Sequence, residues 1–97
     1  MPTITVPIGG ANYSLYARLK VVRATETPNF IEKGSIQADA ANTSDLKVGD
    51  KSMTSSDYGQ LLHAEDSSTL DGTVLSEIFV RNDGPDVLKV NLNYSAM

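Results

Sequence analysis

Apolar side chains recur at every second position over several stretches of this chain. In residues 12–22 the apolar positions are Tyr13, Leu15, Ala17, Leu19 and Val21. A period of two is that of a β-strand with one buried and one solvent-facing side, because successive side chains point to opposite faces of a sheet. Residues 12–22 are therefore predicted to form one long strand.

The start of the chain repeats this alternation over a shorter run, in which the apolar positions are Ile4, Val6 and Ile8. Pro2 and Pro7 have no backbone donor, which confines the run to a sheet edge or to an extended arm. Residues 1–11 are therefore predicted to be an N-terminal arm or an edge strand. Residues 12–97 are predicted to form a single β domain.

An irregular strand is predicted for residues 30–38. Phe30, Ile36 and Ala38 share the parity of one face, and Lys33-Gly34 interrupts the run between them. This pattern is typical of a strand with a β-bulge, or of two short strands around a turn.

The polar segment that follows has no clear period. Residues 40–58 are rich in Ser, Thr, Asp and Asn, which indicates a long surface loop with a short strand around Leu46 and Val48. A loop of this length in so small a domain is often a binding loop or a disordered one. Residues 60–64 form either a short strand or one helical turn, because periodicity does not distinguish the two in so short a run.

The last part of the chain has the pattern of an antiparallel hairpin. Two β-rich runs, residues 73–82 and 87–95, flank the turn Asp83-Gly84-Pro85-Asp86. Such runs around a Gly/Pro turn predict a hairpin. In the second run the positions predicted to face the core are Leu88, Val90, Leu92 and Tyr94.

The first run of this hairpin is apolar on both sides. Val74, Ile78 and Val80 share one face, whereas Leu75 and Phe79 lie on the other. Either loops cover this second face, as in a sandwich or barrel, or Leu75 and Phe79 form an exposed contact patch.

Together these patterns predict an all-β fold, a small antiparallel β-sandwich or barrel with a C-terminal hairpin and an extended N-terminal arm. The 97 residues fit one domain, and the absence of cysteine excludes disulfides and thiolate metal sites as sources of stability. No cofactor is predicted.

Charge is distributed unevenly along the chain, although the net charge is only −4. Residues 1–23 hold Arg18, Lys20 and Arg23 and no acid, whereas residues 52–80 hold five acids and no Lys or Arg. Either both stretches are solvated faces, or the basic stretch of one copy meets an acidic segment of another copy or an acidic shell. Eight basic residues against twelve acids make nucleic acid a poor partner.

The chain begins without the basic and apolar regions of a signal peptide, and no apolar run approaches the length of a membrane span. The protein is therefore expected to be made in a cytoplasm, with no membrane partner.

Candidate catalytic and metal-binding residues are few. His63 is the one histidine, and no Gly-x-Ser-x-Gly pattern is present, so His63 is predicted to be an ordinary surface or half-buried residue. Residues 66–77 resemble a calcium loop only in part, because Leu70 replaces an oxygen ligand and Gly72 comes one position late. No catalytic, cofactor or metal site is predicted, and the chain is not expected to be an enzyme.

The closing stretch, residues 75–92, reads Leu-Ser-Glu-Ile-Phe-Val-Arg-Asn-Asp-Gly-Pro-Asp-Val-Leu-Lys-Val-Asn-Leu. It resembles the strand, turn and strand of small bacteriophage virion proteins, the capsid decoration or cement proteins and related β-sandwich modules. The resemblance implies a non-catalytic virion protein, made in the host cytoplasm, that binds the outer surface of an assembled phage head and stabilises it. Its implied partner is the major capsid protein or another virion protein, and it implies a homo-oligomer, a dimer or trimer. The alternative is a tail, head-tail connector or adhesin-type binding module.

Five residues are predicted to bind other proteins. Ile4, Val6 and Ile8 would fill pockets as the N-terminal arm adds to a neighbouring sheet edge, and Leu75 and Phe79 would form a contact patch. If the arm is instead a strand of the domain's own sheet, the binding surface is expected at Leu75, Phe79 and the 40–58 loop.

Overall fold

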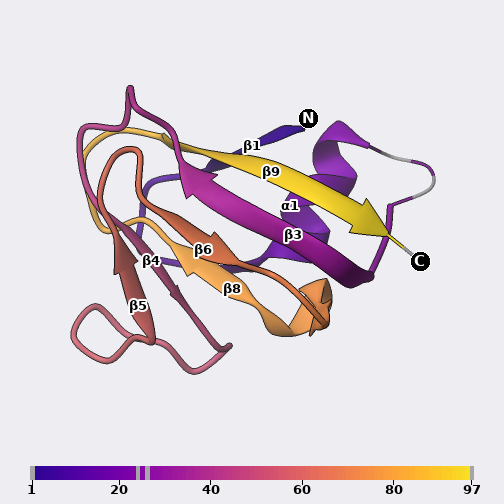
Figure 1. The fold of residues 1–97 in the computed structure, drawn as a ribbon. Coiled ribbons are helices and arrows are strands. Elements are labelled where there is room, and N and C mark those ends of the chain that lie inside the picture. The colour runs from indigo at the N-terminus through magenta and orange to yellow at the C-terminus, as the bar shows by residue number, and fades with distance from the viewer. Residues whose placement is uncertain (1, 24, 26, 97) are drawn as a thin grey trace.

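Two antiparallel sheets pack face to face in the computed structural model, which describes residues 2–23, 25 and 27–96 (Figure 1). Residues 1 and 97, the outer limits of the predicted arm and domain, lie outside the described residues. The all-β fold predicted from the sequence is confirmed, and of the two alternatives, sandwich and barrel, the two separate antiparallel sheets correspond to the sandwich, with one helix added to it.

The first sheet has the strand order β1-β9-β3-β6, and the short strand β7 pairs with the start of β3. Its strands are β1 (Thr3–Val6), β3 (Phe30–Ala38), β6 (Ser67–Thr69), β7 (Thr73–Val74) and β9 (Leu88–Ala96). The second sheet has the order β2-β8-β4-β5. Its strands are β2 (Asn12–Ser14), β4 (Leu46–Gly49), β5 (Gln60–Leu62) and β8 (Phe79–Arg81). The helix α1 (Leu15–Val22) and the 3-10 turn η1 (Leu75–Glu77) complete the fold.

The core lies between the two sheets and is built from their inward side chains. In β9 the buried residues are Leu88, Val90 and Leu92, whereas Lys89 and Asn93 are exposed. The predicted parity of this strand is confirmed. Buried leucine, isoleucine and valine side chains of this kind supply most of the stability of so small a domain.

The prediction of a single strand over residues 12–22 is wrong, because only residues 12–14 are extended and residues 15–22 form α1. The Ser14 hydroxyl accepts the backbone N–H of Ala17 at 3.0 Å and so caps the first turn. Leu15 and Leu19, the two buried residues of the helix, are four positions apart. A spacing of four fits both a strand face and a helix face, so the alternation did not distinguish the two.

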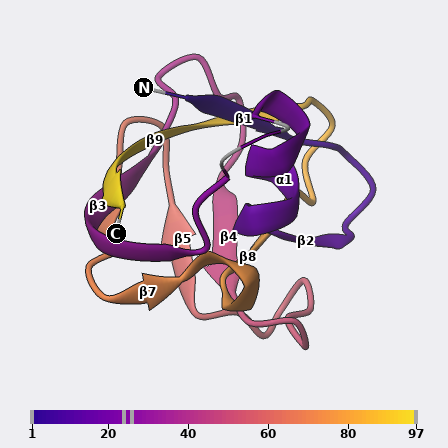
Figure 2. The ribbon, with the colours of Figure 1, turned by 90° about the vertical axis from the view of Figure 1, so that its right-hand side faces the viewer.

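The start of the chain is a strand of the domain's own sheet, so the prediction of a free arm is wrong and the edge-strand alternative is right. β1 pairs with β9 over four residues, from Thr3↔Asn91 to Val6↔Leu88. The two prolines lie just outside β1, where their missing donors do not interrupt the ladder. Helix α1 packs beside β1 (Figure 2), and Arg18 donates to the Thr5 backbone oxygen at 2.8 Å and thereby covers the outer edge of the strand.

The predicted C-terminal hairpin does not form among the described residues, because β8 and β9 belong to different sheets. β8 pairs with β2 and β4, and β9 pairs with β1 and β3. The first predicted strand is also interrupted. The turn η1 breaks the period of two, so Leu75 and Val80 both reach the core although their positions differ in parity.

The buried amide of Asn82 explains why the chain leaves one sheet for the other. Its Nδ2 donates to the Val6 oxygen at 3.0 Å and to the Asp86 oxygen at 2.8 Å, and its Oδ1 accepts the Gly84 N–H at 2.9 Å. These bonds hold residues 82–86 as a compact turn against the end of β1. Val87 and β9 are thereby directed into the first sheet.

The middle of the chain agrees with the sequence patterns. β3 has a register shift between Ile31 and Lys33, which confirms the strand with a bulge. A Cβ atom at Gly34 would lie 2.7 Å from the Asn93 oxygen, so the bulge requires glycine there. β4 confirms the short strand around Leu46 and Val48, and β5 is the strand alternative for residues 60–64.

The register of β9 predicts a large difference between neighbouring substitutions. Leu92→Ala should lower the free energy of unfolding by about 2–5 kcal/mol, because it leaves a cavity between the sheets. Asn93→Ala should change it by no more than about 0.5 kcal/mol, because Asn93 is exposed. Urea denaturation followed by circular dichroism measures both. Equal losses would contradict the inward register of Leu92.

The role of Asn82 predicts that a nearly isosteric change is costly. Asn82→Asp replaces the amide donor with an oxygen that faces the Val6 and Asp86 carbonyl oxygens, so the free energy of unfolding at neutral pH should fall by about 3 kcal/mol or more. Asn93→Asp, which introduces the same charge on the surface, is the matched control and should change stability little. Thermal unfolding at pH 7 compares the two, and similar melting temperatures would mean that the buried amide is not needed.

A candidate protein-binding loop

The structure separates the five residues predicted to bind other proteins. Ile4, Val6 and Leu75 are fully buried in the domain core, so they are not available to a partner, and this part of the prediction is wrong. Ile8 is 52% exposed and lies just beyond the end of β1, and Phe79 is half-buried on β8. The remaining expected surface, the 40–58 loop, contains β4 (Leu46–Gly49) and continues beyond that strand as a connection to β5.

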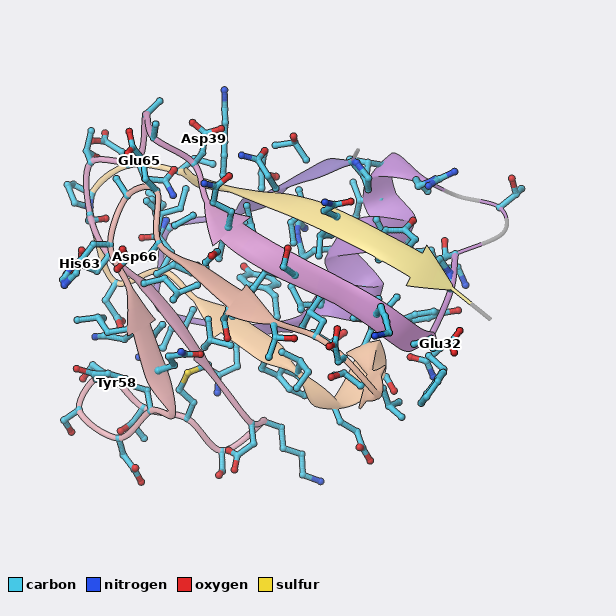
Figure 3. All side chains as sticks on the ribbon, viewed as in Figure 1. Glu32, Asp39, Tyr58, His63, Glu65 and Asp66 are labelled. Atoms are coloured by element: carbon cyan, nitrogen blue, oxygen red, sulfur yellow. The ribbon has the colours of Figure 1, made fainter. Side chains whose placement is uncertain are left out.

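Residues 50–59, hereafter the 50–59 loop, connect β4 to β5 and extend from one corner of the molecule (Figure 3, where Tyr58 is labelled). Gly49 and Gly59 close its base. A Cβ atom at Gly49 would lie 3.1 Å from the Gly59 nitrogen, and one at Gly59 would lie 3.0 Å from the Val48 oxygen. Met53 is buried and fills the space beneath the loop. The two glycines therefore allow the loop ends to approach closely while Met53 anchors its middle.

Side chains from the second sheet hold the backbone of this loop. Asn12 Nδ2 on β2 donates to the Lys51 oxygen at 3.0 Å and to the Met53 oxygen at 2.8 Å. Arg81 Nη1 on β8 donates to the Met53 oxygen at 3.3 Å, and Lys47 Nζ on β4 donates to the Ser55 oxygen at 2.7 Å. Three strands thus hold three carbonyl groups of the 50–59 loop in place.

Asp83 ties two of these donors together. Its carboxylate accepts from Lys47 Nζ at 2.8 Å and from Arg81 Nε at 3.0 Å, and all three side chains are largely shielded from solvent. The hydrogen bond from Lys47 holds the pKa of Asp83 below its usual value, partial burial opposes this effect, and the Arg81 guanidinium lowers it further. The carboxylate therefore remains ionised and keeps both cations in position.

Local hydrogen bonds shape the loop itself. Asp50 Oδ1 accepts from the backbone N–H and the hydroxyl of Ser52, at 2.9 and 2.7 Å, and these bonds lower the pKa of the Asp50 carboxyl. Thr54 N donates to the Asp57 oxygen at 2.8 Å, and Asp57 N donates to Thr54 Oγ1 at 3.0 Å. These are the side-chain-to-backbone bonds that stabilise tight turns, so the loop has a defined shape.

The exposed surface of the loop combines small polar residues with one aromatic ring. Ser55, Ser56, Asp57 and Tyr58 are all exposed. Lys47 Nζ lies 5.1 Å from the centre of the Tyr58 ring, a cation–π contact that restrains the ring. A surface cleft of about 320 Å³ lies between Asp50, Ser52, Asp57 and Tyr58.

A second cleft adjoins the loop and includes one of the predicted residues. It is about 360 Å³ in volume and is bordered by Lys51, Glu77 and Phe79; we call it the Phe79 cleft. Phe79 lies opposite Gly49 in the ladder between β8 and β4, which places it at the base of the 50–59 loop. The structure therefore brings Phe79 together with the loop and separates it from Leu75.

The residues that hold the loop were not singled out by sequence reasoning. The sequence pattern indicates only a turn at Asp83, and Lys47 and Asn12 carry no signal of their own. Arg81 and Asp83 do carry one, because residues two apart at the end of a strand share a face and have opposite charges. That spacing predicts an ion pair, although it does not predict which segment the pair holds.

His63 lies at the other end of β5 and is a surface residue, as predicted. Its Nδ1 is 2.6 Å from Asp45 Oδ1, and its backbone N–H donates to Asp66 Oδ2 at 3.1 Å. The hydrogen bond to Asp45 and the negative charge of that carboxylate raise the pKa of the imidazole. Across the part of the chain that the structure describes, no group of three or more His, Asp or Glu side chains is arranged to hold a metal ion.

Comparisons with known proteins assign the chain to no family. No family model matches it, and neither the curated proteins nor the solved structures show significant similarity to it. Within residues 2–23, 25 and 27–96, no helix has the length and apolar character needed to cross a membrane.

The ion pairs of Asp83 predict that acid loosens the 50–59 loop. Because the carboxyl pKa is lower in the folded chain than in the unfolded one, its stabilisation is complete above the unfolded value of about 3.9 and is lost as pH falls through the lower, folded value. Backbone order parameters from NMR relaxation should therefore fall in residues 54–58 on acidification, from about 0.85 toward 0.6.

At neutral pH the Asp83→Asn variant should show the same loss of order in the loop. Asp57→Asn is the matched control, because the bonds of Asp57 within the loop come from its backbone. A loop that stays rigid in Asp83→Asn would show that the carboxylate does not hold it.

Proposed function

We propose that this chain is a non-catalytic protein-binding module that contacts its partner through the 50–59 loop and the adjoining Phe79 cleft. The observation that carries this proposal is that Asn12, Lys47 and Arg81, on three separate strands, hold the loop by hydrogen bonds to its backbone oxygens. An exposed loop that is already ordered loses less conformational entropy on binding than a mobile one, at roughly 1–2 kcal/mol per backbone residue.

The chemistry of the loop fits a protein surface. A rigid, amphipathic tyrosine provides contact area at low entropic cost, and serine hydroxyls provide adaptable hydrogen bonds; both features are common in protein-binding loops. Tyr58 is 37% exposed, with Lys47 Nζ over its ring, and the exposed Ser55 and Ser56 precede it in the loop. Phe79 adds an apolar surface next to this polar loop.

We further propose that the partner is a virion protein and that the module is a capsid decoration protein on the outer surface of a phage head. This proposal rests on the resemblance of residues 75–92 to small virion proteins, and the β-sandwich is the fold which that resemblance implies. The partner would be the major capsid protein or another virion protein, and the module would act as a homo-oligomer. A shell offers many identical binding sites. Each copy would bind weakly through its one loop, and the affinities of linked copies would combine into a stronger overall attachment.

A binding experiment tests the role of the loop. The native particle is purified, stripped of this chain and offered purified variants, and the bound fraction is measured by sedimentation. Tyr58→Ala should weaken rebinding about tenfold or more, because the truncation of a central aromatic residue in an interface typically costs more than about 1.4 kcal/mol. Phe30→Ala, which removes an exposed aromatic ring from β3, should rebind like the wild-type chain.

The same experiment distinguishes a capsid decoration protein from a tail or connector module. Co-sedimentation of the native chain with an icosahedral particle supports decoration, and co-sedimentation with a tail or fibre supports a tail or connector module. Wild-type rebinding by both Tyr58→Ala and Asp83→Asn would exclude the 50–59 loop as the contact surface.

A further inference from the structure

The two ends of the β1-β9-β3 sheet carry opposite charges. β9 spans this sheet from Leu88 to Ala96, and the molecule is 35 Å long along its longest axis (Figure 1). Hydrogen bonds fix which residues lie at each end. Neither end includes the 50–59 loop, so the inference drawn from them is independent of the function proposed above.

Acidic side chains gather at the end where β9 begins and β3 finishes: Figure 3 shows Asp39 and Glu65 near each other there, and Asp66 further down the same side, beside His63. Asp39 N donates to the Lys89 oxygen at 3.1 Å, Ala38 N donates to the Asp66 oxygen at 2.9 Å, and Glu65 N donates to the Ala38 oxygen at 2.8 Å. Asp86 immediately precedes Val87 and β9. Lys89 interacts electrostatically with Asp39 and offsets one of these charges, so the acids remain in excess.

Two apolar side chains are exposed at this acidic end. Val6 and Leu88 are the last pair of the β1–β9 ladder, so Ile8 and Val87 lie just beyond it. Ile8 is 52% exposed and Val87 is 55% exposed. We call the surface formed by Ile8, Val87, Glu65, Asp66 and Asp86 the acidic end.

The opposite end carries the last turn of α1. Val22 and Arg23 border a surface cleft together with Pro2 and Thr3, and Arg23 Nη1 donates to the Tyr94 hydroxyl at 2.8 Å, which places this turn at the far end of β9 (Figure 2). Val21 is 66% exposed and Val22 is 50% exposed, and Lys20 and Arg23 flank them. We call Lys20, Val21, Val22 and Arg23 the helix end.

Among the described residues, the charged side chains of α1 and of the helix end are all basic. Residues 1–23 contain no Asp or Glu. Helix α1 packs against β1, and Glu32 lies on β3, two strands away from β1. Lys33 follows Glu32 directly in the sequence. The exposed valines are therefore bordered by cations, whereas Ile8 and Val87 are bordered by carboxylates.

We propose that copies of this chain associate head to tail, with the helix end of one copy on the acidic end of the next. Val21 and Val22 would pack against Ile8 and Val87, while Lys20 and Arg23 face Glu65, Asp66 and Asp86. Each surface has the apolar centre and the opposite charge that the other requires, and one chain carries both. A second copy is therefore the occupant that fits each end.

A contact between two different surfaces is heterologous, so it does not close on itself in a two-fold dimer. It produces a ring when the rotation between copies closes and an open filament when it does not. This association would give the predicted homo-oligomer a direction, and it would leave the 50–59 loop of every copy outside the contact. Because the charges are exposed, the association should weaken steeply with salt.

Sedimentation velocity on the full chain tests the proposal. At about 10 mM salt the wild-type chain should form species larger than the 10.4 kDa monomer as its concentration rises, and at about 1 M salt it should return to the monomer. Lys20→Glu/Arg23→Glu and Glu65→Lys/Asp86→Lys should each shift this association to concentrations about tenfold higher or more.

Mixing the two charge-reversed variants in equal amounts provides the sharpest result. Each variant alone has two ends of like charge, but every end of one variant is complementary to the partner end of the other. The mixture should therefore regain the association that both variants lack alone, in complexes that contain the two at 1:1. Asn93→Asp, which adds a charge to the exposed face of β9 outside both ends, should behave like the wild-type chain.

Substitutions that leave the charges unchanged test the contribution of the apolar centre. They also keep the proposal testable if the charge-reversed variants misfold. Val21→Ser and Val87→Ser should each weaken association, with unchanged circular dichroism spectra. A wild-type chain that stays monomeric at low salt would overturn the proposal. So would an association that survives both charge reversals, or a mixture in which folded variants fail to recover it.

Discussion

The hydrogen bonds of one buried amide, Asn82, determine how the two sheets are connected. A polar side chain is costly to bury unless it is hydrogen-bonded, and Asn82 satisfies both of its functional atoms with backbone groups. Two of its partners, Gly84 and Asp86, belong to the turn that follows it, and the third is Val6, at the other end of the chain. The amide thereby fixes the turn, the end of β1 and the entry to β9 at the same time.

The neighbours of Asn82 organise the opposite side of the same strand end. Side chains alternate across an extended chain, so Arg81 and Asp83 point away from the core when Asn82 points into it. Arg81 reaches the Met53 oxygen of the 50–59 loop, and Asp83 orients Lys47 toward the Ser55 oxygen. Three consecutive residues thus connect the core to the displayed loop. A disturbance of this strand end would affect both the stability of the sandwich and the shape of its candidate binding surface.

The arrangement also separates the surfaces that we propose for partner binding and for contact between copies. Helix α1 and Arg18 cover the edge of β1, an edge that would otherwise offer free backbone groups to another chain. The 50–59 loop extends from the second sheet, whereas the acidic end and the helix end lie at the two ends of the first. A module with this division can contact a partner through its loop while copies meet at their ends. Neither contact needs the domain to change shape.

The sequence by itself determined the class of the fold, the parity of β9, the bulge in β3 and the position of a long polar loop. These features depend on local chemistry, because a period of two, an interrupting glycine and a run of Ser, Thr, Asp and Asn act within a few residues. Only the tertiary structure decided which strands are neighbours. Periodicity assigns a side chain to a face and does not name the strand beside it, so the run before Asp83 and the run after Asp86 matched a hairpin equally well.

The same reason explains the other corrections. Leu15 and Leu19 fit a helix as well as a strand, and the Ser14 cap together with the bond from Leu15 N to the Ile78 oxygen selects the helix. Sequence patterns indicate Ile4, Val6 and Leu75 as contact residues because their burial depends on segments that are distant in the sequence. Ile4 and Val6 are covered because β1 pairs with β9, and Leu75 because η1 packs against α1. The hydrogen bonds and ion pairs that hold the 50–59 loop involve residues 12, 47 and 81–83. Bonds between such distant positions exist only once the sheets have packed, and no local pattern encodes them.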